Sequence, residues 1–213
     1  MIFSPTLIFW DWNGTLLDDV GASLAAVNDM RFARRRPPLD LPAYRAAIDV
    51  PIRRFYEIHF DLAQEDYAAV LREYNAAYLR HLPSCGLAEG AVEVLKALQS
   101  RQIRQVILTS GQQENVERAL AHFGVAEYFD AVLGASDTLA GFKDERATMY
   151  LRAHRIPPQE VLVVGDLVHD YALAQGQGTQ CVLVGWGHQS RAEFGDLPVA
   201  VLHNLAEIME CIR

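Results

Sequence analysis

Four short apolar runs, each ending abruptly in small or polar residues, constrain the fold of this chain more than any other feature. The runs occupy residues 7–10, 106–108, 161–164 and 181–184. Continuous apolar runs of this length are typical of strands that are buried on both faces, as in a parallel sheet. A shorter run at 131–133, before Gly134, is a possible fifth strand.

Amphipathic helical patterns separate the later apolar runs. They cover residues 89–101, 112–123, 145–154 and 171–175. Strands that alternate with helices predict right-handed crossovers and an α/β fold with a doubly wound, Rossmann-like parallel sheet. Such sheets bind ligands at the carboxyl ends of their strands, and the polar residues after the apolar runs all fall at those ends.

One stretch interrupts this alternation. Between Leu16 and Gly86 no strand pattern occurs, and four amphipathic segments follow one another instead, at 20–34, 41–48, 52–60 and 64–81. Prolines separate these segments, as expected at helix boundaries. We therefore expect an inserted α-helical domain of residues 17–86 within a core domain of residues 1–16 and 87–213.

Composition and charge exclude several classes of protein. With 51% hydrophobic residues the chain is not disordered, and no apolar run reaches the roughly 18 residues of a membrane-spanning helix. A net charge of −8 argues against a nucleic-acid partner, and the run Arg34-Arg35-Arg36 is interpreted as a solvated helix end. The three cysteines share no CxxC spacing and the start lacks a secretory signal, so we expect a cytoplasmic protein. A monomer or a homodimer is expected.

Carboxylates follow two of the apolar runs. Asp11 closes the first run and is followed by an Asn13-Gly14 turn, and Asp166 and Asp170 follow the third. Acids that converge at one crevice repel each other and call for a cation, and all-oxygen ligands favour Mg²⁺ over zinc. The alternatives are an ordinary turn after a strand and two acids that cap a helix.

Two further features suit an anionic ligand. Lys143 is one of only two lysines in a chain with many arginines, and its compact ammonium suits a single phosphate or carboxylate oxygen. Thr109-Ser110-Gly111 precedes a helical pattern, and a hydroxyl beside the free N–H groups of a helix start can bind an anion. A solvent-facing lysine and a plain helix N-cap are the corresponding alternatives.

The joint order of these residues resembles the four motifs of the haloacid dehalogenase (HAD) superfamily of phosphohydrolases. The matching stretches are Asp11-x-Asn13-Gly14-Thr15, Thr109, Lys143 and Gly165-Asp166-x-x-x-Asp170. The resemblance covers essentially the whole chain, and the insertion resembles the small helical cap of that superfamily. It implies a phosphatase that acts on a small phosphorylated metabolite, such as a phosphoglycolate-like phosphomonoester.

The resemblance also implies roles for individual residues. Asp11 would be the nucleophile and form an aspartyl-phosphate intermediate. Thr109, with Ser110 and Gly111, would bind the transferring phosphoryl group, and Lys143 would neutralise charge on Asp11 and on that group.

The implied cofactor is Mg²⁺. Asp11, the backbone carbonyl of Asn13 and Asp166 would bind the ion, and Asp170 would support its waters or Lys143. In the inserted domain, Arg53 and Arg54 would meet a distal anionic group of the substrate, unless they form only a solvated helix face.

The sequence departs from the superfamily at Asn13, where the usual residue is an aspartate that acts as general acid and base. An amide cannot exchange a proton near neutral pH, and such help is typically worth roughly 10²–10⁴-fold in rate. The chain could be a slow phosphatase or could use a substitute base such as His169. It could also be a catalytically weak member that binds a phosphometabolite or a protein partner.

Overall fold

The computed structural model describes residues 2–135 and 143–213. The chain forms two compact units, which we call the core unit and the helical unit. The core unit comprises Met1–Leu17 and Leu87–Arg213, and the helical unit comprises Asp18–Gly86.

A six-stranded sheet forms the centre of the core unit, and every pair of neighbouring strands is parallel. The order across the sheet is β5-β4-β1-β6-β7-β8. The strands are β1 (Leu7–Trp10), β4 (Arg104–Gln112), β5 (Ala131–Ala135), β6 (Val161–Gly165), β7 (Gln180–Val184) and β8 (Ala200–Leu202). The predicted α/β class is confirmed. The last strand, β8, was not predicted, because its three residues are too few to form a clear apolar run.

The order of the strands makes the end of β1 a topological switch point. From β1 the chain proceeds to β4 and β5 on one side, and it then crosses to β6, β7 and β8 on the other. The direction of winding therefore reverses beside β1. In open α/β sheets, ligands bind at this reversal, outside the carboxyl ends of the strands.

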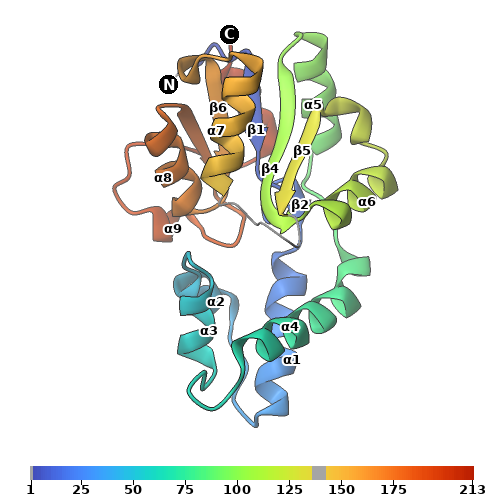
Figure 1. Ribbon diagram of the computed structural model, residues 1–213, viewed down its shortest axis with the longest axis vertical. Coiled ribbons are helices and arrows are strands. Elements are labelled where there is room, and N and C mark those ends of the chain that lie inside the picture. The colour runs from blue at the N-terminus through green and yellow to red at the C-terminus, as the bar shows by residue number, and fades with distance from the viewer. Residues whose placement is uncertain (1, 136–142) are drawn as a thin grey trace. The chain divides into compact units, whose positions relative to one another are not determined.

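Helices cover both faces of the sheet, which explains why the strands are apolar throughout. Leu7 and Phe9 point to the face covered by α7 (Lys143–His154) and α8 (Val168–Gln177), which lie side by side (Figure 1). The remaining core helices are α5 (Ala91–Ser100), α6 (Gln113–Phe123), α9 (Arg191–Phe194) and α10 (Ile208–Cys211).

A buried polar network anchors the end of β1 to α5. Trp10 donates from Nε1 to Gln105 Oε1 at 3.1 Å, and Gln105 donates from Nε2 to the Leu95 carbonyl at 2.9 Å. Both side chains are almost fully buried, and unmade hydrogen bonds would be costly there. The network thus fixes the strand residue that immediately precedes Asp11.

The helical unit consists of four helices, as the sequence predicted. They are α1 (Val20–Ala33), α2 (Leu41–Ala47), α3 (Arg53–His59) and α4 (Tyr67–His81). Aromatic rings form much of its interior, with Phe55 in edge contact with Tyr44 and Tyr56. Where the chain enters and leaves this unit, β2 (Leu17–Asp18) and β3 (Gly86–Leu87) pair.

The basic run at 34–36 lies at the end of α1, as predicted, and Arg35 and Arg36 are exposed, but Arg34 is partly buried. The Arg34 guanidinium lies 2.5 Å from Glu65 and 2.6 Å from Glu73, and its side chain is only 20% exposed. Arg36 donates to the backbone carbonyl of His59. Because a guanidinium has five donors in a fixed fork, Arg34 can join both acids at once and link α1 to α4.

Among the described residues, we find no helix with the length and hydropathy needed to cross a membrane.

Candidate functional site

The site begins with Asp11, which directly follows β1. Its backbone N–H donates to the Val164 carbonyl at 2.8 Å and so continues the pairing of β1 with β6. The chain then turns sharply, because Leu16 and Leu17 both donate to the Trp12 carbonyl. This turn keeps the Asp11 side chain buried, at 8% exposure, at the carboxyl edge of the sheet.

Gly14 allows the turn to approach the acidic residues. Its φ of +71° lies in the left-handed region that favours glycine. A Cβ at this position would lie 2.3 Å from Asp166 Oδ2 and 2.6 Å from the His188 ring. Only a residue without a side chain fits between β1 and these groups.

Lys143 joins two of the predicted acids. It is the first residue of α7, and its Nζ lies 2.9 Å from Asp11 Oδ1 and 2.5 Å from Asp170 Oδ1. All three side chains are buried. The alternative of a solvent-facing lysine is therefore wrong, and an ammonium lies beside the predicted nucleophile.

Asp166 lies in the turn between β6 and α8, and Asp170 lies in the first turn of α8. Asp170 Oδ2 accepts from the backbone N–H groups of Asp166 and Leu167, both at 3.1 Å. A Cβ on Gly165 would lie 2.2 Å from the Asp170 carboxyl carbon, so the glycine is needed for this packing. Asp170 thus caps its own helix and also pairs with Lys143.

Burial dominates the electrostatics of these groups. It raises the pKa of Asp11, against the opposing pull of Lys143, and raises that of Asp166 well above its usual value. Burial opposes the charged form of Lys143, but attraction to Asp11 and Asp170 outweighs it and raises its pKa. Three buried carboxyls therefore lie together, and the Lys143 ammonium pairs with only two of them, an arrangement that a divalent cation would stabilise.

The acids fit a magnesium ion in chemistry and spacing. Asp11, Asp166 and Asp170 each offer a carboxylate oxygen, and these oxygens lie within 4.8 Å of one another. Two oxygens bound to one Mg²⁺ are at most about 4.2 Å apart, so only a small adjustment is required. Asp170 accepts one hydrogen bond from Lys143 and two from the backbone N–H groups of Asp166 and Leu167, so the protein itself holds its carboxylate.

The segment 109–111 differs from its prediction as the start of a helix. Strand β4 continues to Gln112, and α6 begins only at Gln113. Thr109 is buried and its Oγ1 accepts from the Gly111 N–H at 3.0 Å. Because Oγ1 accepts this bond, its own proton is left to donate to a ligand. The plain N-cap alternative is therefore wrong.

The remaining predicted residues lie in two places. Asn13 is half-buried, and its Oδ1 would lie 3.5 Å from a Cβ on Gly111, so it faces the 109–111 segment, where Ser110 is exposed. Arg53 and Arg54 belong to α3 and the helical unit. They pair there with Glu57 at 2.8 Å and with Asp49 at 3.0 Å.

Sequence reasoning missed the loop after β7. His188 donates its backbone N–H to Asp166 Oδ2 at 2.6 Å, and a Cβ on Gly187 would lie 2.3 Å from the Asp166 Cβ. Thr15 was quoted only as part of a motif, yet its hydroxyl lies 3.5 Å from Asp166 Oδ1. The signal was the Gly185-x-Gly187 pattern after an apolar run, which marks close backbone approach.

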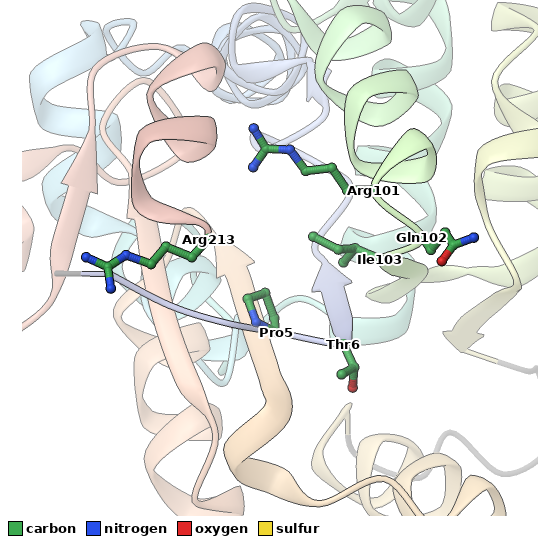
Figure 2. Close-up of a pocket in the computed structure, with 6 residues that line it drawn as sticks. All are labelled: Pro5, Thr6, Arg101, Gln102, Ile103 and Arg213. Carbon is green, nitrogen blue, oxygen red and sulfur yellow. The ribbon is translucent and has the colours of Figure 1, made fainter.

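A recess lies near the amino ends of β1 and β4, away from these acids. It measures about 540 Å³ and is lined by Pro5, Thr6, Arg101, Gln102, Ile103 and Arg213. Figure 2 shows that the guanidinium groups of Arg101 and Arg213 do not converge on one point. Since Arg101 also donates to the Ile212 carbonyl at 3.1 Å, this recess lacks the focused charge of an anion site.

Comparison with known proteins agrees with this geometry. Residues 8–184 match the family model described as haloacid dehalogenase-like hydrolase. Phosphoglycolate phosphatase 1 of Pseudomonas aeruginosa is 27% identical over 217 residues, which cover 97% of this chain and 79% of that protein. Tyrosine-protein kinase PtkA of Mycobacterium tuberculosis is 29% identical over 199 residues, covering 91% of this chain and 66% of the relative.

Solved structures show the same fold. A haloacid dehalogenase-like family hydrolase from Streptococcus pneumoniae superposes with a TM-score of 0.84 at 20% identity, and 97% of each chain is covered. The structure of Mycobacterium tuberculosis PtkA superposes with a TM-score of 0.78 at 26% identity, again with 97% of each chain covered.

Proposed function

The chain belongs to the haloacid dehalogenase-like hydrolase family, and we propose that it is a Mg²⁺-dependent phosphohydrolase that cleaves a small phosphomonoester through an aspartyl-phosphate on Asp11. One observation carries the proposal. Lys143 Nζ bridges Asp11 and Asp170 inside a buried cluster that also contains Asp166. Such a cluster combines a carboxylate nucleophile, a fixed cation and oxygen ligands for a metal.

The reaction follows from the chemistry of these groups. A carboxylate oxygen of Asp11 forms a bond to phosphorus while the bond to the leaving oxygen breaks, and that oxygen keeps the electron pair. Lys143 and the Thr109 hydroxyl stabilise the negative charge of the phosphoryl group. Water then attacks phosphorus, releases phosphate and restores the Asp11 carboxylate.

In this proposal Mg²⁺ is held by Asp11, Asp166 and the Asn13 carbonyl, and Asp170 supports Lys143. The bound ion would supply positive charge for the phosphate dianion in a protein whose net charge is −8. The His188 N–H donates to Asp166 and holds it in place for this role. Gly14 has no side chain and so leaves room for the Asp166 carboxylate.

Asn13 limits the substrates that this site can process. Its amide cannot protonate a leaving oxygen. Phosphate esters of phenols and acyl phosphates need a general acid least, because their leaving groups are stable as anions. The relatives are named for phosphoglycolate phosphatase and tyrosine-protein kinase activities, and they do not agree on one phosphoryl acceptor. Arg53 and Arg54 are our candidates for binding a distal anion of the substrate.

The direct test is turnover of p-nitrophenyl phosphate with Mg²⁺. We expect measurable release of p-nitrophenol that is lost in EDTA and lost in Asp11→Asn. Absence of turnover in the wild type, or turnover that survives Asp11→Asn, would contradict the proposal.

A second candidate function is a catalytically weak protein that binds a phosphometabolite or a protein partner, and Asn13 is the observation that favours it. The variant Asn13→Asp separates the two functions. A phosphatase that lacks only its acid should gain roughly 10²–10⁴-fold in turnover of alkyl phosphates, measured as phosphate release. Asn75→Asp, an exposed change on α4 with the same charge difference, is the matched control. Phosphate binding without turnover in both wild type and Asn13→Asp would favour the second function.

A further inference from the structure

We infer that Arg146 is a positioning residue that holds the 109–111 segment in the conformation that binds the phosphoryl group. The inference rests on the proposed function and extends it to a residue outside the predicted site. Arg146 Nη2 donates to the Thr109 carbonyl at 2.7 Å, and its Nε donates to the Leu133 carbonyl at 3.3 Å. These two carbonyls belong to neighbouring strands, β4 and β5.

The 109–111 segment needs such support because it lies beyond the regular ladder. Pairing of β4 with β1 ends at Ile107, and pairing with β5 passes from Leu108 directly to Gln112. Within the described residues, the peptide groups of the segment are therefore outside both strand registers. The Gly111 N–H donates to Thr109 Oγ1, so the Ser110 N–H is the group of this segment that can meet an anion, and the Thr109 carbonyl needs a donor.

Arg146 donates to the Thr109 carbonyl and thereby sets the direction of the next N–H group. In a trans peptide the C=O and N–H bonds point in opposite directions. When the Thr109 carbonyl points toward the guanidinium, the Ser110 N–H must point away from it. The Thr109 hydroxyl is fixed independently, because Oγ1 accepts from the Gly111 N–H at 3.0 Å.

The same helix fixes both cationic elements of the site. Lys143 and Arg146 are three residues apart on α7, so their side chains lie on one face of its first turn. Lys143 contacts Asp11 and Asp170, whereas Arg146 contacts the end of β4. The first turn of α7 thus fixes the position of the nucleophile relative to the phosphoryl-binding segment.

The test compares Arg146→Met and Arg146→Lys with the wild type. Binding of inorganic phosphate in the presence of Mg²⁺ is measured by calorimetry, together with KM and kcat for p-nitrophenyl phosphate. We expect Arg146→Met to weaken phosphate binding and raise KM about tenfold, since a hydrogen bond to a charged donor is lost at the binding segment. Arg146→Lys can still reach one carbonyl, and we expect a loss of about threefold. Arg152→Met, an exposed change on the same helix, should change neither value.

Affinity for Mg²⁺ distinguishes positioning from a merely structural role. We expect it to remain within about twofold in both Arg146 variants, since the acids and Lys143 are untouched. Parallel loss of Mg²⁺ and phosphate affinity, together with a lower Tm, would overturn the inference, and so would unchanged phosphate affinity. If Arg146→Met does not fold, Arg146→Lys carries the test, and wild-type phosphate affinity in that variant overturns the inference. A wild type that neither binds phosphate nor hydrolyses the substrate would overturn the proposed function, and the inference with it.

Discussion

Gly14 is one of the glycines that bring the backbone close to the acidic cluster. Replacing it with alanine introduces two penalties. The left-handed φ of +71° costs an alanine about 1–2 kcal/mol, and the new Cβ would lie 2.3 Å from Asp166 Oδ2. We expect Gly14→Ala to lose Mg²⁺-dependent turnover and to unfold at a lower temperature than the wild type.

Gly178 provides a matched control for this change. It also has a φ of +71°, at the end of α8, but a Cβ there would meet no atom within 4 Å. Gly178→Ala should lose a similar amount of stability through the backbone alone and keep its turnover. Equal loss of activity in both variants would show that backbone strain, and not the approach to Asp166, explains the effect.

His59 makes the helical unit sensitive to acid. The ring is buried between Arg31, whose Nη1 lies 3.3 Å from Nδ1, and Phe55. Burial, reinforced by Arg31 and Arg36, lowers the pKa of His59 from 6.5 to about 4. Because the unfolded chain binds a proton at higher pH than the folded chain does, stability is lost as the pH falls from about 6.5 to 4.

We expect His59→Asn to flatten this part of the stability profile. The asparagine Oδ1 can accept the Arg31 hydrogen bond in place of Nδ1, but the side chain does not titrate. The measurement is Tm between pH 7 and 4 for both proteins, with His154→Asn as an exposed control. A slope in His59→Asn as steep as that of the wild type would rule out this histidine as the cause.

At the scale of elements, the sequence predicts the strands and helices that apolar periodicity defines. The runs at 7–10 and 161–164 became β1 and β6, and the four segments of the insertion became α1 to α4. The sequence does not predict how far a strand extends beyond its apolar run. Thr109 before a helical pattern suggests an N-cap, yet β4 continues to Gln112, where it pairs with Ala135 of β5.

The candidate site, too, could be predicted only in part from the sequence. Acids at strand ends and a rare lysine could be identified from the sequence, because parallel strands place their carboxyl ends at one edge. The contributions of His188 and Arg146 run through backbone atoms, His188 as an N–H donor and Arg146 to a carbonyl. Any residue type can supply a backbone donor or acceptor, so the identity of the residue does not reveal such a contact, and near His188 the signal is instead the Gly185-x-Gly187 pattern.

At the scale of the whole molecule, the buried acids predict that Mg²⁺ stabilises the fold. An ion at 100 times its Kd adds about 2.7 kcal/mol, which for a chain of this length raises Tm by about 5–10 °C. We expect this rise in the wild type and its loss in Asp166→Asn. Sodium chloride at equal ionic strength and Asp196→Asn, an exposed acid in the core unit, serve as controls. An undiminished rise in Asp166→Asn would place the metal elsewhere.

The proposed mechanism requires that phosphorus becomes bonded to Asp11. The most direct measurement is mass spectrometry of acid-quenched protein after brief reaction with acetyl phosphate and Mg²⁺, followed by peptide mapping. Because Asn13 cannot activate water well, we predict that one phosphoryl group accumulates on the peptide containing Asp11, and that Asp11→Asn lacks it. Release of phosphate with no adduct on Asp11, or with the adduct on another residue, would contradict the account.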